Sequence, residues 1–306
     1  AIVPVPEGQL PVELPEVEKY QPTDFGESPL AAISDWVNTK CPVCGSPAVR
    51  ETDTMPTWAG SSWYYLRYID PDNDKILADP DKLKYWLPVD LYNGGMEHVT
   101  LHLLYSRFWH KFLFDIGVVP TKEPYQKRVS HGMILAPDGQ KMSKSRGNVV
   151  NPDEMVQKFG ADAFRLYEMF LGPFDQVVKW QTDGIRGTYR FLEKVWRISS
   201  RVGVEHVQPS SDKREDKDQE NLINRLVQKI NSDIDNMQFN TSVSSLMEFV
   251  NFVEKDEFIS QSVWEKFLII LSLFAPHISE ELWSQTNKET LICQQVWPSL
   301  DESKII

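Results

Sequence analysis

The hydrophobic and polar positions of this chain divide it into an aperiodic first part, a middle of short elements and a helical last part. Two apolar runs, residues 86–92 and 128–135, predict buried strands. The first run ends in Asn93-Gly94-Gly95, and we expect a helix to open near Glu97. A strand, a glycine pair and a helix in this order place ligands at the carboxyl edge of a parallel sheet.

Residues 1–40 show neither a helical nor a strand period. Their prolines predict an extended arm that packs on something else rather than a domain. Downstream, Ser61 or Ser62 is expected to cap a short aromatic helix. Apolar clusters of this kind are more often core than binding pocket.

The last part of the chain reads as helices. Asn151 and Pro152 predict a capped helix start, and residues 161–171 predict a second short helix. From Asp183 onward the apolar positions recur at helical spacing, over 185–201, 222–237, 241–253, 263–274 and 278–283. We therefore expect an antiparallel helical bundle.

Composition narrows the class of protein. The chain has 306 residues, of which 41% are hydrophobic, which suits two or three globular domains. No apolar run approaches membrane-spanning length, and we expect no membrane partner. Three cysteines are too few for a disulfide framework and favour a reducing cytoplasm. A net charge of −12 argues against non-specific coating of nucleic acid, but leaves room for a local basic stripe.

A lysine-rich segment, Lys141-Met142-Ser143-Lys144-Ser145, carries the clearest chemistry. Ala136-Pro137-Asp138-Gly139 before it predicts a turn. Glycines at 139 and 147 flank the segment, so it reads as a mobile loop. Ammonium groups on such a loop can neutralise charge that develops on a reacting phosphoryl group. The alternative is a solvated basic turn.

Three further features leave alternatives open. Cys41 and Cys44 have the spacing of half a zinc knuckle, or of a similar turn without metal. His98 and His102 lie four residues apart, a spacing at which two histidines can bind a metal. In the usual metal-binding motif, however, the glutamate follows the first histidine, whereas Glu97 precedes it here, which favours histidines that form a pocket wall. A basic helix face is either solvated or contacts RNA phosphates; it consists of Arg186, Arg190, Lys194, Arg197 and Arg201.

These segments together resemble the bacterial-type leucyl-tRNA synthetases. The five-residue lysine loop matches a signature of class I synthetases. The stretches 61–65 and 94–105 look leucyl, while Phe239-Asn240-Thr241, Ala275-Pro276-His277 and Glu280-Glu281-Leu282-Trp283 look like the anticodon-binding bundle. The resemblance implies the second half of an α/β, Rossmann-like catalytic domain followed by an all-α anticodon-binding bundle.

The resemblance also assigns roles. Lys144 would contact ATP phosphates and Lys141 would help to close the loop, with Ser143 beside them. Gly95 and Glu97 would hold the ribose, and the backbone at Met133 and Ile134 would face the adenine. The leucine pocket would be lined by Trp58, Ser61, Tyr64, His98 and His102. The family implies ATP with Mg²⁺, and a zinc ion completed by a second cysteine pair upstream.

The implied function is ligation of leucine to tRNA(Leu) through leucyl-adenylate. The implied domains are an arm (1–50), half a catalytic domain (51–150), a stem-contact region (151–182) and the bundle (183–306). Phenylalanine is frequent in the family where Trp58 stands, and the signature His-x-Gly-His is absent from this chain. We therefore expect the chain alone to be inactive and to need a missing N-terminal half. The alternatives are an isoleucyl- or valyl-type synthetase, or a non-catalytic tRNA-binding chain.

Overall fold

The computed structural model describes residues 1–16, 26–54, 58–203, 213–286, 289–301 and 303. Part of the predicted arm, residues 17–25, lies outside these ranges. The chain forms two compact units. Unit 1 comprises residues 1–92 and 97–127, and unit 2 comprises residues 93–96 and 128–306. Among the described residues, no helix combines the length and the apolarity that crossing a membrane requires.

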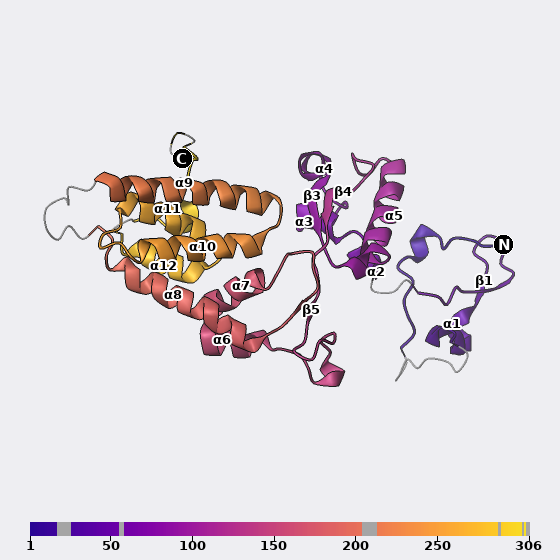
Figure 1. Cartoon of the computed structure of the whole chain (residues 1–306). Helices are drawn as coiled ribbons and strands as arrows, with labels where there is room; N and C mark the ends of the chain where they lie inside the picture. Colours follow the sequence, from indigo (N-terminus) through magenta and orange to yellow (C-terminus); the bar gives the residue numbers. More distant parts are fainter. Residues whose placement is uncertain (17–25, 55–57, 204–212, 287–288, 302, 304–306) are drawn as a thin grey trace. The chain divides into compact units, whose positions relative to one another are not determined.

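Unit 1 is built from short elements joined by long connections (Figure 1). Its helices are α1 (Ser34–Val37), α2 (Trp58–Ser61), α3 (Tyr64–Ile69), α4 (Pro80–Trp86) and α5 (His102–Asp115). Its 3₁₀ turns are η1 (Glu7–Gln9), η2 (Pro29–Ala32) and η3 (Met96–Val99). Its strands are β1 (Asn38–Lys40), antiparallel to β2 (Pro47–Val49), and β3 (Val89–Asn93), which pairs with β4 (Tyr125–Val129).

The apolar core of unit 1 is small, and polar groups are buried beside it. The core consists of Tyr65, Leu66, Ala78, Leu83, Leu87, Leu113 and Val119. His110 is buried, with Nδ1 2.8 Å from the Tyr65 hydroxyl. Its Nε2 lies 2.8 Å from the carbonyl oxygen of Thr121, which can only accept a hydrogen bond. Nε2 therefore carries the hydrogen and Nδ1 accepts from Tyr65. Burial lowers the pKa of His110 and keeps the ring neutral.

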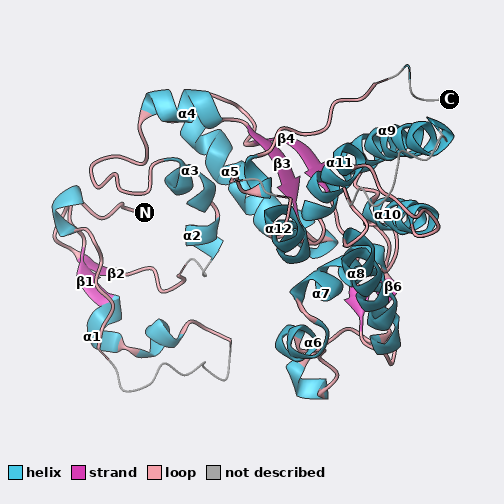
Figure 2. Cartoon of the chain, turned by 90° about the vertical axis from the view of Figure 1, so that its left-hand side faces the viewer, coloured by secondary structure: helices cyan, strands magenta, loops and turns pink. Residues whose placement is uncertain are grey.

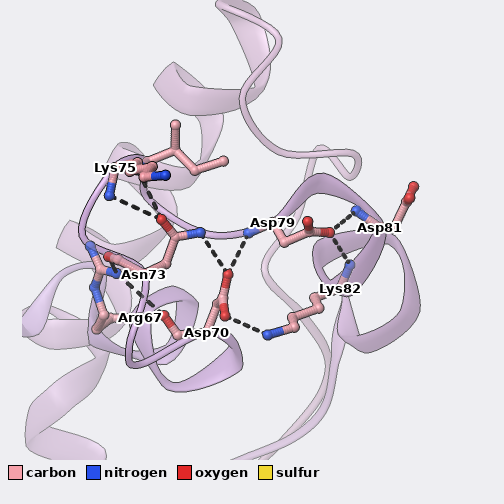
Figure 3. A network of polar contacts seen from close by, with 8 residues as sticks. Arg67, Asp70, Asn73, Lys75, Asp79, Asp81 and Lys82 are labelled. Atoms are coloured by element: carbon pink, nitrogen blue, oxygen red, sulfur yellow. Dashed lines mark hydrogen bonds and ion pairs between the residues drawn. The ribbon is translucent and has the colours of Figure 1, made fainter.

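A second buried polar group, Asp70, joins α3 to α4 (Figure 3). Its carboxylate accepts hydrogen bonds from the Asn73 amide at 2.8 Å, the Asp79 backbone N–H at 3.0 Å and the Lys82 ammonium group. Asp79 in turn caps α4 by accepting from the N–H of Lys82 and its neighbour Asp81. The Lys82 hydrogen bond, followed by those of Asn73 and Asp79, lowers the pKa of Asp70 to about 2.

Two sequence predictions in unit 1 are wrong at their boundaries. The run 86–92 is not one buried strand, because Trp86 ends α4 and the strand covers Val89–Asn93, with Leu91 exposed. The Asp79 cap and Pro80 start the helix, and Pro88 disfavours helical geometry at the residue before it. Ser61 and Ser62 do not cap α3. Both hydroxyls donate back to the carbonyl of Trp58 in α2 instead.

Unit 2 is mainly helical (Figure 2). Its helices are α6 (Pro152–Phe159), α7 (Ala161–Phe170), α8 (Ile185–Ser199), α9 (Lys213–Asp235), α10 (Phe239–Val253), α11 (Gln261–Ser272) and α12 (Pro276–Ser284). Its 3₁₀ turns are η4 (Lys144–Arg146), η5 (Thr182–Gly184) and η6 (Ile292–Gln294). Strand β5 (Ile134–Leu135) runs parallel to β6 (Val178–Lys179). The predicted run 128–135 is thus divided between β4 and β5. The predicted cap is confirmed, since the Asn151 side chain accepts from the Asp153 N–H at 3.0 Å.

The bundle core fills the space between the helices of unit 2. Phe267 stacks on Phe249 at 4.9 Å and on Trp264 at 5.1 Å between ring centroids, and all three are buried. Helices α9 and α10 pack side by side, connected by residues 236–238 (Figure 1). At this connection the buried Asp233 carboxylate accepts from the Thr241 hydroxyl at 2.8 Å. The antiparallel pairing expected for 222–253 is therefore present.

Asp70 provides the first testable prediction. Its pKa is lower in the folded state than in the unfolded chain, so its contribution to stability is present above about pH 4. That contribution is lost as the pH falls through about 2. Asp70→Asn should lower the thermal unfolding midpoint of unit 1 at pH 7, and the difference from the native chain should shrink between pH 4 and pH 2. Far-UV circular dichroism, with hydrogen exchange of α3 and α4, measures this.

Asp81→Asn is the matched control. Asp81 also faces a lysine, Lys84, at 3.3 Å, but both side chains are exposed. An exposed pair contributes little, so this variant should unfold like the native chain. A gap for Asp70→Asn that stayed constant down to pH 2 would contradict the role of its ionised form.

Candidate active site

The lysine loop, residues 141–145, follows a tight turn at the end of β5. Leu135 and Lys141 face each other in an antiparallel bridge. Within the turn, the Ala136 N–H donates to the Gln140 carbonyl at 2.8 Å. Gly139 has a φ of 80°, which residues with a Cβ rarely adopt. The predicted turn is confirmed, and it brings Lys141 beside β5.

The cations of this loop are available to a ligand. Lys141, Lys144 and Arg146 are exposed, and none of them makes a salt bridge within the described part of the chain. Met142, by contrast, packs against the core of unit 2. The loop is therefore anchored by one apolar side chain and presents its charges to solvent. Such an arrangement can attract phosphates.

Strand β5 carries the segment expected to face adenine. The Met133 carbonyl accepts from the Val178 N–H at 3.0 Å, and Ile134 pairs with Val178 in the parallel register. Met133 and Ile134 are half-buried. Their backbone is thus fixed by β6.

A close approach just before β5 requires glycine. The Gly132 N–H donates to the Phe174 carbonyl at 2.7 Å. A Cβ on Gly132 would lie 1.7 Å from the carbonyl oxygen of Gln176, far inside contact distance. This backbone packing interrupts the apolar run 128–135, which explains why the structure divides it into two strands.

The glycine pair and the acidic residue expected at the ribose lie at the end of β3. Gly95 is buried, and the Gly94 N–H donates to the Val129 carbonyl at 3.3 Å. Glu97 is exposed within η3. The helix expected near Glu97 is interrupted, because α5 begins only at His102.

All five residues expected in the leucine pocket come together in unit 1. The ring of Trp58 lies 6.4 Å from that of His98, and the ring of Tyr64 lies 5.7 Å from that of His102, between centroids. The carbonyl of Ser61 lies 2.7 Å from His102 Nε2. Tyr64 is 43% exposed, whereas the adjacent Tyr65 is in the core. The aromatic segment therefore divides between a core face and an open face.

The hydrogen bonds of His102 fix its tautomer. Because the Ser61 carbonyl can only accept, Nε2 donates to it, and Nδ1 accepts from the Tyr92 hydroxyl at 2.9 Å. The buried ring thus has both nitrogens hydrogen-bonded to residues of unit 1. His98 differs, since its buried Nδ1 has no hydrogen-bond partner among the described residues.

The cysteine pair lies in the turn between β1 and β2. The Cys41 N–H donates to the Ser46 carbonyl, and the Gly45 N–H donates to the Cys41 carbonyl, both at 2.8 Å. Hydrogen bonds from Ser46 lower the pKa of the exposed Cys44 thiol. The turn suits two thiolate ligands, but no group of three or more metal ligands exists among the described residues. The chain thus supplies at most half of a tetrahedral zinc site there.

The structure divides the basic face of α8. Lys194 lies 2.7 Å and Arg197 2.5 Å from the carboxylate of Glu254, just after α10. Arg201 donates to the carbonyl of Glu254 at 2.9 Å. The lysine, followed by Arg197, lowers the pKa of Glu254. These three side chains therefore join α8 to α10.

The other two arginines are less engaged. Arg186 lies 3.8 Å from Asp183, and the Arg190 guanidinium donates to the carbonyl of Arg186 at 3.2 Å. Two aromatic residues of the same helix, Tyr189 and Trp196, are 41% and 49% exposed. They line a cavity of about 690 Å³ together with residues of α6, α7 and α12. Arg186 lies one helical turn before Tyr189 and Arg190 directly follows it in the sequence, while Glu193 lines the cavity as well.

Two family models match the chain. "tRNA synthetases class I (I, L, M and V)" matches residues 30–181, and "Anticodon-binding domain of tRNA ligase" matches residues 216–305. The chain belongs to the class I tRNA synthetases. Its α/β part with the lysine loop and its helical part with α9–α12 are the catalytic and anticodon-binding portions of this family.

Relatives agree with this assignment. The leucine–tRNA ligase of Alkaliphilus oremlandii (strain OhILAs) is 53% identical over 304 residues, which is 99% of this chain and 37% of the relative. A crystal structure of the ternary complex of Agrobacterium radiobacter K84 LeuRS, tRNA and LeuAMS matches with a TM-score of 0.84 and 34% identity, over 99% of this chain and 41% of that one. The methionyl-tRNA synthetase of Mycobacterium tuberculosis, solved with methionyl-adenylate, shares the fold at a TM-score of 0.54, 15% identity and 83% and 56% coverage.

This synthetase chain therefore spans just over a third of the length of the curated relative. Its site also contains residues that the sequence did not reveal. Tyr92 holds His102, and the ring of Tyr105 lies 5.5 Å from that of Trp58. Tyr105 follows His98 and His102 at helical spacing, which could have indicated its place. Tyr92 lies in β3, which the sequence predicted to be a buried strand, so its hydrogen bond to His102 was not expected.

Gly132 provides the second prediction. Gly132→Ala should lower the free energy of unfolding of unit 2 by about 1–3 kcal/mol or more, because the new methyl group meets a backbone oxygen that has no room to move. Urea unfolding followed by circular dichroism measures this. Gly187→Ala is the control, since nothing lies within 4 Å of its Cβ position in α8. It should stabilise the helix by about 0.5–1 kcal/mol. Equal midpoints for Gly132→Ala and the native chain would refute the close approach.

Proposed function

We propose that this chain forms part of a leucine–tRNA ligase, which activates leucine with ATP and transfers it to tRNA(Leu). The observation that carries the proposal is that a chain 53% identical to a leucine–tRNA ligase has both an exposed cationic lysine loop and a cluster of aromatic and histidine side chains around Trp58 and His98. Such an enzyme works in the cytoplasm, where its three free cysteines stay reduced.

The first step joins leucine to AMP. A carboxylate oxygen of leucine attacks the α-phosphorus of ATP, which enters as its Mg²⁺ complex. The bond from this phosphorus to the bridging oxygen breaks, and pyrophosphate leaves with the electron pair. In the second step a hydroxyl of the terminal ribose of the tRNA attacks the leucyl carbonyl, and AMP leaves.

Lys144 and Lys141 act on the charge that grows on the departing phosphates. Neither has a carboxylate partner among the described residues, so their full charge is directed to a bound anion. Ser143, whose hydroxyl lies 2.7 Å from that of Ser145, supplies a further donor to phosphate oxygens. Gly95 and Glu97 would hold the ribose. The backbone of Met133 and Ile134, fixed by β6, would face the adenine.

Trp58, Ser61, Tyr64, His98 and His102 would enclose the leucine side chain. His102 suits an apolar ligand, because both of its ring nitrogens are hydrogen-bonded to other residues and neither is left without a partner beside the ligand. An apolar pocket discriminates by only about 1–3 kcal/mol per methylene, so selection there against valine, which is one methylene smaller than leucine, is limited. The leucyl assignment over the isoleucyl or valyl one is tested by an amino-acid panel in ATP–pyrophosphate exchange.

We assign residues 1–50 to an arm, 51–150 to half of the catalytic domain, 151–182 to a stem-contact region and 183–306 to the anticodon-type domain. Cys41 and Cys44 would bind zinc together with two thiolates from outside this chain. The other side of the nucleotide site would come from a segment with His-x-Gly-His, which none of the six histidines of this chain forms. A chain that only binds tRNA is the second candidate, and that missing motif favours it for the isolated polypeptide.

We propose that tRNA contacts α8 at Arg186 and Arg190, with Tyr189 and Trp196 as stacking surfaces. Cations beside exposed aromatic rings suit unpaired nucleotides, because phosphates pair with the arginines while bases stack. Lys194, Arg197 and Arg201 belonged to the same predicted surface. Their bonds to Glu254 and to the carbonyl of Asp256 indicate that these three residues mainly stabilise the structure.

The third prediction tests the function itself. The isolated chain should show no leucine-dependent ATP–pyrophosphate exchange, and exchange should appear on mixing with a fragment that carries His-x-Gly-His. In that mixture Lys144→Ala should slow adenylate formation by a factor of about 10² or more, with leucine affinity nearly unchanged, because the lysine acts on transition-state charge. Exchange by the chain alone would contradict the need for a second half. Wild-type exchange with Lys144→Ala would remove the lysine from the site.

The fourth prediction tests the tRNA surface. Replacing Arg186 and Arg190 together by glutamine should weaken tRNA binding and reduce the slope of log K against log salt by about 1–2, because each arginine would neutralise one phosphate. Filter binding across a salt series measures both. Replacing Lys194 and Arg197 by glutamine is the control. It should lower the unfolding midpoint and leave the salt slope almost unchanged. The reverse pattern would transfer the tRNA contact to the other half of the basic face.

A further inference from the structure

Asn148 lies three residues beyond the lysine loop, and its side chain is hydrogen-bonded to the first residue and to the middle of the loop. Its Oδ1 accepts a hydrogen bond from the Ser143 N–H at 2.9 Å. Its Nδ2 donates to the carbonyl of Lys141 and to Oδ2 of Asp138, both at 3.3 Å. The other carboxylate oxygen of Asp138 accepts from the Gln140 N–H at 2.9 Å. One half-buried amide therefore links the turn, the first loop lysine and the middle of the loop.

These bonds replace the regular structure that the loop lacks. The β-bridge on one side ends at Lys141, and on the other side the turn η4 begins at Lys144. Between them, Asn148 satisfies the backbone oxygen of Lys141 and the backbone N–H of Ser143. Gly147, with a φ of 63°, turns the chain back so that Asn148 can reach the loop.

The position of the lysine side chains depends on this backbone alone. Within the described residues, neither Lys141 nor Lys144 has a salt-bridge partner that could hold it in place. The point from which each side chain starts is therefore set by Met142 in the core and by the bonds of Asn148. A change away from the reacting atoms that displaces a catalytic group by about 1 Å can lower the reaction rate about 10²-fold.

We propose that Asn148, braced by Asp138, is a positioning residue that pre-organises the lysine loop for adenylate formation. It touches neither nucleotide nor amino acid, and acts by fixing the backbone from which Lys141 and Lys144 extend. Its expected effect on catalysis rests on the proposed function. Its expected effect on the opening of the loop rests only on the geometry of the loop. The two consequences are therefore tested separately.

The structural test uses the isolated chain. Trypsin cleaves after lysine and arginine, so Lys141, Lys144 and Arg146 report how often the loop opens. Asn148→Ala should raise the initial cleavage rate at these sites about tenfold, since cleavage follows the population of open loop. Asn151→Ala is the matched control. It removes the same side chain three residues away, where it caps α6. It should leave cleavage in the loop unchanged. Unchanged cleavage in Asn148→Ala would overturn the proposal whatever the activity of the enzyme.

The catalytic test uses the chain combined with the fragment that carries His-x-Gly-His. Asn148→Ala should lower kcat of leucine-dependent exchange about 10- to 100-fold, with the KM for leucine changed less than about twofold. Transfer of leucine from purified leucyl-adenylate to tRNA should be spared, because no pyrophosphate leaves in that step. Equal losses in both steps, or a normal kcat, would overturn the proposal. Absence of exchange in the native mixture would instead count against the proposed function.

A reciprocal exchange tests the pair directly. Asn148→Asp keeps the acceptor for Ser143 but places two carboxylates against each other, and Asp138→Asn places two amide groups against each other. Each single variant should lower kcat and raise loop cleavage. The double variant restores one amide-to-carboxylate bond with its direction reversed, so it should exceed Asn148→Asp in kcat by about fivefold or more. A double variant no better than Asn148→Asp would exclude the pairing.

Discussion

Strand β5 is the element on which the rest of unit 2 depends. On one side it pairs with β6, whose Trp180 N–H donates to the Leu135 carbonyl at 2.9 Å. On the other side Leu135 bridges to Lys141 at the start of the lysine loop. Trp180 is buried in the same core as the bundle helices. The two residues of β5 thus connect the lysine loop to the core of the bundle. Gly132, just before them, permits the close approach of the Gln176 backbone.

The two units reach stability by different means. Unit 2 has a large core of stacked aromatic and aliphatic side chains. Unit 1 has a small apolar core, and the Asp70 network joins α3 to α4 (Figure 3). His110 and His102 add further links, because each ring is held by a carbonyl oxygen and a tyrosine hydroxyl. A buried polar network specifies a geometry more strictly than apolar contact does, because each unsatisfied group is costly. That strictness would suit the proposed leucine pocket, which must separate ligands of similar size.

The sequence was a good guide where local chemistry decides the outcome. Asn151 before Pro152 predicted a capped helix, and Gly139 predicted a turn, because both depend on neighbours within a few residues. It failed where distant residues decide. Ser62 bonds back to Trp58 instead of capping α3, and the basic face of α8 is divided by Glu254, 57 residues beyond Arg197. The prediction that Trp58, His98 and His102 lie together came only from a family resemblance, because no spacing in the sequence indicates that α2 packs beside α5.

The electrostatics of the chain follow from its acidity. With a net charge of −12, this chain as a whole repels anions, so attraction of an anion must come from cations close to where it binds. At physiological ionic strength this attraction extends only about 8 Å. Hence the cations that matter most are those that carboxylates engage least. On α8, Glu254 neutralises Lys194 and Arg197 at 2.5–2.7 Å, whereas Arg186 has only a longer contact, 3.8 Å, with the exposed Asp183. At the lysine loop the nearby carboxylate is Asp138, and its oxygens are already occupied by Gln140 and Asn148. Asp138 thus braces the loop through Asn148, while Lys141 and Lys144 form no salt bridge with any carboxylate among the described residues.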